Sequence, residues 1–579
     1  MLKKVLLITG LLLTGLFFAE QLAGQTQTQA DVERSLLPDI DPQDIEIRSQ
    51  FQARFPGLSR QPILGFNPRP RVYQIDPDRI PYIEDEEAQL ANLPMGRLDR
   101  PDSPEYNALG YAPPKYAFIR AGVGSDITPE ADLFAIGRID DGHWVSGSLR
   151  YHSSDGHDER VATSYRNFDG VIRSYNRLSE KTRLQLHGGI SSDFNHQLAT
   201  ESADSLFTGF NSRTELFGFR GGAEVTVAQT TLTGIKAYFS SYGHEYSLSS
   251  DLTAFDNQTA SDWGLNAGGE YSMLGQNINE IYRAGLDVRA GAATPADSSS
   301  QGWSVTTLSG TYERLFNYRT DVKISAGLSG VTDSEHDFKF YFSPRAEIKH
   351  TFFRGFNIRG LAYGEPSYRD FREIHRENRF FDFGNPGVHQ YEMAALGEIQ
   401  VEPFIGTKIT GGISYKNISN HLYYSRRTQP MGVTEIERGY YGTLYDDATM
   451  VTIFGGLAQD LKPEVIWLSA NASLREHTLS GIDGDIPYTE TFSVASTISF
   501  RPVRDLLVEG WGEFNSGRKN EFGDSLSSFV RLGGRFEFSI NENFGIYGKL
   551  LNVLDEEYEY WDGFQEHGFR GFVGVTLLF

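Results

Sequence analysis

The sequence predicts an all-β protein: a transmembrane antiparallel β-barrel of about 22 strands (about 20 to 24), preceded by an extended Pro-rich N-terminal segment. Segments with alternating apolar and polar residues follow one another from residue 115 to residue 579, as in strands with one face in hydrocarbon. After residue 24 no apolar run reaches about 18 residues, so a barrel is the only structure with which this chain could span a bilayer. Aromatic residues make up 13% of the chain although its mean hydropathy is -0.38, which fits strands with one apolar face.

Residues 1–24 predict a secretory signal peptide. Lys3 and Lys4 supply positive charge, an apolar stretch follows from residue 5 to residue 19, and Leu22, Ala23 and Gly24 precede the expected cleavage point. A secreted transmembrane barrel is expected in the outer membrane of a Gram-negative bacterium. The chain contains no Cys, which excludes a lipoprotein signal, disulfides and Cys-ligated metal sites.

Residues 25–114 form a segment of different composition. Thirteen of the 23 prolines lie between Pro38 and Pro114, and proline cannot donate a hydrogen bond to a sheet ladder. The segment is therefore predicted to be extended rather than part of the sheet. Two interpretations remain open: a disordered periplasmic leader, or an ordered segment that enters or caps the barrel.

Residues 115–579 are predicted to form the barrel itself. In 338–352 and in 526–540, large apolar residues such as Phe340 and Phe538 alternate with charged ones. A soluble β-sandwich would place the charges outward, but the signal peptide and the end of the chain favour the barrel, with the charges facing a polar lumen. The predicted lumen-facing charges are Arg345, Glu347, Lys349, Arg531, Arg535 and Glu537.

The chain ends on a strand whose apolar face includes Val573, Val575, Leu577 and Phe579. A terminal aromatic residue on such a strand is typical of outer-membrane barrels. We predict that these four residues form the barrel-assembly signal and that the partners include outer-membrane lipid and the barrel-assembly machinery. Both chain termini are expected in the periplasm, with short turns at 140–142 and 501–504 on that side and long loops at 202–213, 370–389 and 426–448 outside.

The last 39 residues, 541–579, resemble the C-terminus of TonB-dependent outer-membrane receptors. The resemblance rests on Asn552, Val553, Asp555 and Tyr558, which match an element that precedes the final strand in that family. A second, shorter similarity is the Phe-Gly-Asn-Pro-Gly sequence at 383–387. The family resemblance implies a barrel for uptake of a solute across the outer membrane.

One part of the family pattern is missing from the N-terminal region. The roughly 90 residues between the signal peptide and Lys115 contain neither a recognisable plug domain nor a TonB-contacting box. The chain therefore resembles the shorter, plugless receptor-like barrels of Bacteroidetes-type bacteria, and whether it uses TonB stays open.

The predicted function is solute passage or uptake through the polar lumen. The alternative is a non-transporting structural barrel or complex subunit that docks a periplasmic or lipoprotein partner through its N-terminal segment. The net charge of -23 argues against a nucleic-acid partner.

An enzyme is not predicted, because neither a GxSxG nor an HExxH motif occurs. We predict no catalytic residue, no cofactor and no metal site. The densest group of potential ligands is His143, His152 and His157 with Asp140, Asp141, Asp155 and Asp158. We interpret it as solvated hairpin turns rather than as a site, since Asp-Gly-His sequences are ordinary turn compositions.

Overall fold

The computed structural model describes residues 116–579, apart from 126–127, 141, 155–163, 200–209, 229, 231–232, 251–257, 297–298, 382–386, 426–440 and 482–483. The predicted signal peptide and Pro-rich segment lie outside the described residues, so these two predictions remain untested.

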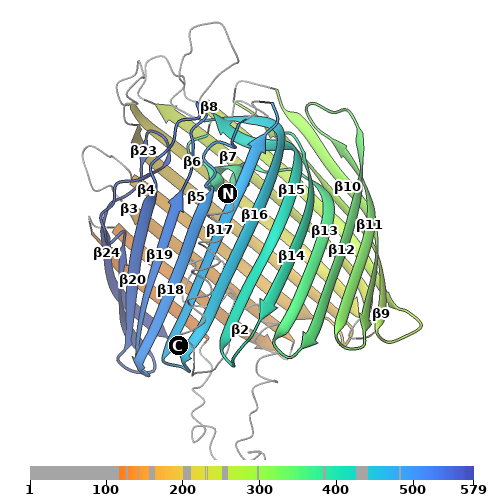
Figure 1. Cartoon of the computed structure of the whole chain (residues 1–579), viewed down its shortest axis with the longest axis horizontal. Helices are drawn as coiled ribbons and strands as arrows, with labels where there is room; N and C mark the ends of the chain where they lie inside the picture. Colours follow the sequence, from red (N-terminus) through yellow and green to blue (C-terminus); the bar gives the residue numbers. More distant parts are fainter. Residues whose placement is uncertain are drawn as a thin grey trace, which may run out of the picture. The chain divides into compact units, whose positions relative to one another are not determined.

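Twenty-two strands form one closed antiparallel sheet, which confirms the predicted fold class and strand number (Figure 1). They are β1 (Ala117–Gly124), β2 (Thr128–Asp140), β3 (His143–Ser154), β4 (Ser164–Arg177), β5 (Thr182–Ala199), β6 (Phe210–Ala228), β7 (Gly234–Ser250), β8 (Gln258–Leu274), β9 (Glu280–Thr294), β10 (Gln301–Phe316), β11 (Thr320–Thr332), β12 (Lys339–Phe353), β13 (Phe356–Ser367), β14 (Gln390–Val401), β15 (Thr407–Ser425), β16 (Gly442–Lys462), β17 (Ile466–Leu479), β18 (Phe492–Val503), β19 (Leu506–Ser516), β20 (Phe529–Ser539), β21 (Phe544–Leu551) and β24 (Arg570–Leu578). A separate two-stranded hairpin consists of β22 (Glu559–Trp561) and β23 (Phe564–Gln565).

The sheet closes where the first strand meets the last. β1 pairs with β24 from Phe118 opposite Leu578 to Gly124 opposite Phe572, and the backbone N–H of Tyr116 donates to the carbonyl of Phe579 at 2.6 Å. A Cβ atom on Gly122 would lie 2.3 Å from the hydroxyl oxygen of Tyr547. Glycine is thus needed at this position for the tyrosine ring to lie over the seam between β1 and β24.

Large apolar side chains of β12 point away from the barrel interior. On β12 and just before it, Phe338, Phe340 and Phe342 are 59%, 70% and 58% exposed, while Tyr341 between them bonds to an inward loop residue. Because successive side chains of a strand point to opposite faces of the sheet, this alternation gives the barrel an apolar outer surface and a polar inner one. None of the helices among the described residues is long and apolar enough to cross a membrane.

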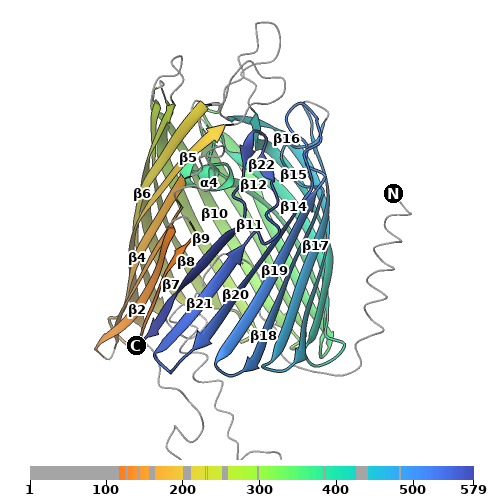
Figure 2. The ribbon, with the colours of Figure 1, turned by 90° about the vertical axis from the view of Figure 1, so that its left-hand side faces the viewer.

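The connections alternate between short and long, which defines two rims (Figures 1 and 2). The short-turn rim carries turns such as 317–319, 354–355 and 504–505, and the chain ends there. The long-loop rim carries connections such as 333–338, 368–389, 517–528 and 552–569. The predicted turn at 501–504 is shorter than expected, because β18 continues to Val503. Likewise β6 begins at Phe210 and β16 at Gly442, inside two of the predicted long loops.

A helix that the sequence analysis did not predict interrupts the connection between β13 and β14. Helix α4 (Phe371–Glu377) begins after Asp370, whose carboxylate accepts the backbone N–H of Glu373 at 2.8 Å. This bond satisfies one of the free donors at the helix start. His375 and Arg376 lie in the last turn, where positive charge is favourable.

Candidate functional site

The β13–β14 connection, meaning its described residues 368–381 and 387–389, folds into the mouth of the barrel at the long-loop rim. Figure 2 shows α4 within the outline of the sheet, close to this rim. The helix buries Phe371, Ile374 and His375. A hydrophobic helix face inside a barrel needs an apolar partner, and the surrounding wall supplies one.

Apolar residues from well-separated strands meet the connection in one buried cluster. Because β6–β9 and β15 are not neighbours in the sheet, a cluster that includes both must cross the barrel mouth. Phe380 stacks on Phe564 of β23, with ring centroids 4.0 Å apart. Each fully buried side chain of this size contributes about 1.5–3 kcal/mol. The cluster comprises Leu216, Tyr246, Leu248, Ala260, Ala293, Phe371, Ile374, Phe380, Phe381, Leu422, Tyr424, Tyr441, Tyr488 and Phe564.

Polar contacts fasten α4 to the wall on the side of β4–β8. Arg372 lies 2.8 Å from Asp169 of β4, and the backbone N–H of Phe371 donates to Asp262 of β8 at 3.0 Å. His244 of β7 lies 2.8 Å from the other oxygen of Asp262 and orients that carboxylate. Hydrogen bonds to charged groups at partly buried sites are stronger than neutral ones, so these contacts fix the helix in one position.

A further ion pair fastens the end of the connection to the small hairpin. Arg379 lies 2.6 Å from Glu566, next to β23. Burial would lower the pKa of the Arg379 guanidinium, but the charge of Glu566 and its hydrogen bond outweigh burial and raise that pKa. The Arg379 guanidinium therefore stays charged. The connection is thus held both on the β4–β8 side and on the β22–β23 side of the mouth.

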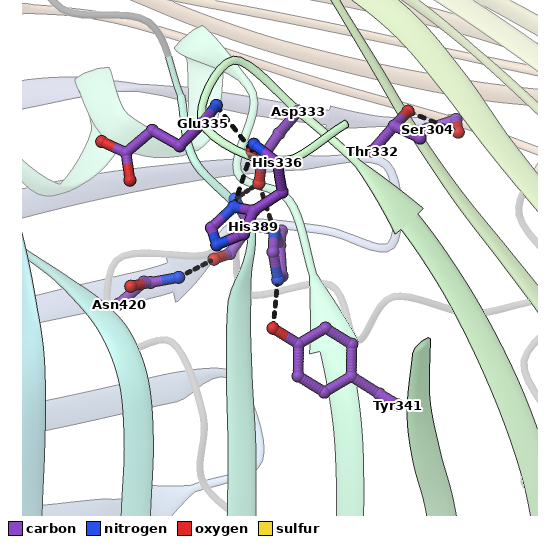
Figure 3. Close-up of polar contacts among 8 residues, drawn as sticks. All are labelled: Ser304, Thr332, Asp333, Glu335, His336, Tyr341, His389 and Asn420. Carbon is purple, nitrogen blue, oxygen red and sulfur yellow. Dashed lines mark hydrogen bonds and ion pairs between the residues drawn. The ribbon is translucent and has the colours of Figure 1, made fainter. Parts of the chain in front are cut away.

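A compact His/Asp group joins this connection to the β11–β12 loop (Figure 3). Asp333, directly after β11, accepts from the ring of His336 at 3.0 Å and from the ring of His389, directly before β14. Its carboxylate also accepts the backbone N–H groups of Glu335, His336 and His389 at 2.9, 2.8 and 3.1 Å. One carboxylate therefore organises two loops.

The second ring nitrogen of His389 bonds to Tyr341. The distance from Tyr341 Oη to His389 Nε2 is 2.6 Å. With Asp333 as acceptor at Nδ1, these partners favour the tautomer with the proton on Nδ1 and the tyrosine hydroxyl donating to Nε2.

Electrostatics agree with that assignment. Burial would raise the pKa of the Asp333 carboxyl, but the hydrogen bonds from His389, His336 and Glu335 lower it to about 2. Burial lowers the pKa of His389, although Asp333 opposes the effect. The pair is therefore a carboxylate with a neutral imidazole.

The densest group of potential ligands in the sequence lies elsewhere. His143 and Asp140 do meet, at 2.7 Å, in the β2–β3 hairpin on the short-turn rim. His152 lies near the other end of β3 and contacts Glu130 and Asp132 at 3.6 and 3.4 Å. The structure thus separates His143 from His152, while His157, Asp141, Asp155 and Asp158 lie outside the described residues.

The six predicted lumen charges all lie at odd-numbered positions of β12 and β20. Exposed apolar residues of these strands, such as Phe342 and Phe536, lie at even-numbered positions on the opposite, outer face. On β12, Glu347 lies 2.8 Å from Arg359 and 3.2 Å from Lys349, and Arg345 lies over the ring of Tyr363. On β20, Arg531 pairs with Glu513 at 2.5 Å and Arg535 with Glu509 at 3.0 Å. Glu537 lies opposite Tyr547 in the β20–β21 ladder. Their influence on a passing solute remains a prediction.

The family-like motif has a local structural role in the β21–β24 connection. The Asn552 amide donates to the carbonyls of Glu556 and His567 at 2.9 and 3.2 Å. Asp555 accepts the backbone N–H of Phe569 at 2.7 Å. Tyr558 stacks on Phe529, with centroids 4.5 Å apart. The 383–386 part of the second similarity lies outside the described residues.

The C-terminal residues predicted to form the assembly signal expose their side chains to the outside of β24. Val573, Val575 and Phe579 are 63%, 37% and 57% exposed, and Leu577 is partly exposed. Whether they direct assembly remains a prediction.

No protein-family model and no curated protein matches the sequence. Solved structures do resemble the barrel. The FrpB iron transporter from Neisseria meningitidis (F5-1 variant) aligns with a TM-score of 0.64 and 8% identity over 81% of this chain and 83% of that one. The siderophore receptor PirA from Acinetobacter baumannii aligns with a TM-score of 0.61 and 10% identity over 81% of both chains. The copper transporter OprC aligns with a TM-score of 0.61 and 11% identity over 80% of this chain and 83% of that one.

These neighbours are TonB-dependent receptors. At such low identity the likeness shows a shared barrel fold and leaves the solute open.

Proposed function

We propose that this chain is an outer-membrane barrel that takes up a solute, and that the β13–β14 connection closes its lumen at the long-loop rim. The neighbours with the same fold are described as transporters and receptors, which supports uptake as the general function. The long-loop rim would face the outside of the cell, with both chain termini in the periplasm.

The observation that carries the proposal is the buried cluster across the mouth. A sheet of 22 strands encloses a lumen wide enough to require a filling, and here residues of the barrel's own loops pack in it. Closure by side chains and ion pairs, rather than by a covalent bond, is reversible. Because the buried apolar cluster contributes more than the ion pairs, opening would require the cluster to come apart and therefore an input of energy.

We propose further that opening is coupled to a TonB-type partner, since the structural neighbours are TonB-dependent receptors. The partner would act from the periplasmic side, through residues 25–114 or the short-turn rim. The lumen-facing charges on β12 and β20 would then select the solute as it passes.

Single-channel conductance in planar bilayers tests the closure. The mature chain is compared with a variant in which Phe371–Glu377 is replaced by seven Gly and Ser residues. Arg376→Ser, an exposed position of the same helix, is the matched control. Each variant is also measured in a chain that begins at Pro114, which separates a block by residues 25–114 from a block by the connection.

We expect small or no steps from the mature chain and from Arg376→Ser, and large steps when α4 is replaced. Large steps from every variant would contradict closure and indicate an open pore. Silence from all variants, with the barrel folded by heat-dependent gel mobility, would instead favour the non-transporting barrel that docks a partner.

A further inference from the structure

The geometry points to a binding site for a divalent transition-metal ion between Asp333, His336 and His389. The ion would join the β11–β12 loop to the end of the β13–β14 connection. This inference goes beyond the proposed function, because ion binding here does not require that a solute passes through the barrel.

The three donor groups already converge. One ligand atom from each residue lies within 4.8 Å of the other two, and His336 Nδ1 is 3.0 Å from Asp333 Oδ1. Ligands bound to zinc at about 2.0–2.2 Å lie about 3.4 Å apart in a tetrahedral site. An ion could therefore enter between the carboxylate and the two imidazoles after small side-chain rotations.

The groups around these ligands hold them in place. Three backbone N–H groups fix the Asp333 carboxylate, and the His389 carbonyl accepts from Asn420 Nδ2 at 3.2 Å. With an ion on Nδ1, His389 would carry its proton on Nε2 and donate it to Tyr341 Oη, so the existing contact reverses its direction without being lost. Outer partners of this kind orient a metal-bound imidazole.

Burial and donor type limit which ion fits. The side chains of Asp333 and His389 are 0% and 1% exposed, whereas that of His336 is 27% exposed. Water can thus complete the coordination from the His336 side. Two imidazoles and one carboxylate favour Zn²⁺, Cu²⁺ or Ni²⁺ over Ca²⁺ and Mg²⁺, which prefer oxygen ligands.

Among the described residues, the other His–carboxylate contacts do not bring three ligand atoms together; His152, for example, contacts Glu130 and Asp132 through different ring nitrogens. Within the part of the chain that the structure describes, the proposed site is the only group of three or more His, Asp or Glu side chains placed to share an ion. The Asp140–His143 pair has a similar contact distance of 2.7 Å, and it provides a matched control.

Zinc binding to the full mature chain in detergent tests the inference. The protein is freed of metal with EDTA and titrated with Zn²⁺ against a chromophoric chelator, with Mg²⁺ and Ca²⁺ in excess. We expect one tightly bound Zn²⁺ per chain, unaffected by the other two ions. His336→Ala should weaken binding by about tenfold or more, and His143→Ala should leave it unchanged.

A second variant and a second measurement distinguish loss of the site from misfolding and from non-specific zinc binding. Tyr341→Phe keeps all three ligands and removes only the outer hydrogen bond, so it should weaken binding less than His336→Ala does. Co²⁺ bound at the site should give visible absorption bands that His336→Ala removes, while heat-dependent gel mobility shows each barrel folded. Absence of a tight Zn²⁺ ion in the folded wild-type protein, or equal affinity in His336→Ala, would overturn the inference.

Discussion

Arg372 of α4 contacts Asp169 of β4 across 203 positions of sequence, with 2.8 Å between Nη2 and Oδ2. Asp169 also lies 3.3 Å from Arg220 of β6, so a single wall carboxylate receives two guanidinium groups. Helix α4 is therefore tied to the wall by a contact that can be broken without disturbing the sheet.

Loss of this contact should make the β13–β14 connection open more often. The two side chains are 18% and 29% exposed, so Arg372→Ala should cost about 0.5–1 kcal/mol, or an opening increase of about two- to fivefold. The chain has no Cys, so Ile374→Cys, at a position 3% exposed, supplies a unique reporter. The measurement is its reaction rate with a thiol reagent.

Arg376→Ala in the same Ile374→Cys background is the control, and it should react at the parent rate. Ser334→Cys on the exposed β11–β12 loop sets the rate of an open position. Equal rates with and without Arg372→Ala would mean that the apolar cluster alone determines opening.

Asn552→Ala should loosen the β21–β24 connection. The substitution leaves the carbonyls of Glu556 and His567 without this donor, at a cost of about 1–3 kcal/mol. Asn552 also has a φ of 46°, which asparagine tolerates better than alanine. We expect faster amide hydrogen exchange and proteolysis within 552–569, with the barrel intact on gels.

Asn552→Gly separates the two causes, because glycine accepts the backbone angle but forms no side-chain bond. Asn541, in an exposed turn where its Oδ1 accepts the N–H groups of Asn543 and Phe544 at 2.9 Å each, is the matched control. If Asn541→Ala had the same effect on 552–569, the Asn552 hydrogen bonds would not explain it.

Phe579→Ala should reduce assembly in cells more than it reduces stability. Its backbone bonds to Tyr116 and Ala117 survive the substitution, while the exposed aromatic side chain is lost. We expect less folded barrel in the outer membrane but normal refolding in detergent, both measured by heat-dependent gel mobility. Deleting Phe579 removes the backbone bonds as well and should impair both. Equal amounts of folded Phe579→Ala and wild-type barrel in the outer membrane would contradict the prediction that Phe579 is part of the assembly signal.

Arg345→Glu should shift the ion selectivity of an opened barrel toward cations, since a charge facing the lumen acts on the permeating ion. The shift is measured as a reversal potential in a KCl gradient, in the variant with α4 replaced. Arg354→Glu, in the short β12–β13 turn, is the control and should cause a smaller shift. An unchanged reversal potential for Arg345→Glu would show that Arg345 does not act on the permeating ions.

The sheet could be predicted from the sequence because its signal is local and repeated. Each strand shows the alternation separately, as Phe338, Phe340 and Phe342 do with their charged or polar neighbours. Closure of the sheet follows because the backbone N–H and C=O groups at an open sheet edge would have no hydrogen-bond partner in lipid. Strand ends were less predictable, because β6, β16 and β18 extend into polar sequence at the rims.

Helix α4 and the His/Asp group could not be predicted in the same way. A helix of seven residues is too short to show an apolar period, and packing against the wall rather than propensity stabilises it. Asp333 and His389 are 56 positions apart, and they meet only because β11–β14 pair in a particular register and two loops turn inward. The Asp333-x-x-His336 spacing was visible, but it is common in turns.

The seam between β1 and β24 sets an order of events for the newly made protein. Every other ladder in the described sheet joins strands that follow one another along the chain, apart from the small β22–β23 hairpin inserted between β21 and β24, so these pairs can form as soon as both strands are available. The β1–β24 ladder instead waits for the last residues to be synthesised. Until then the growing sheet has two unpaired edges, which are templates for aggregation. An edge of β1 therefore stays unpaired until β24 reaches it, and a chain that ends before β24 gives a sheet that cannot close.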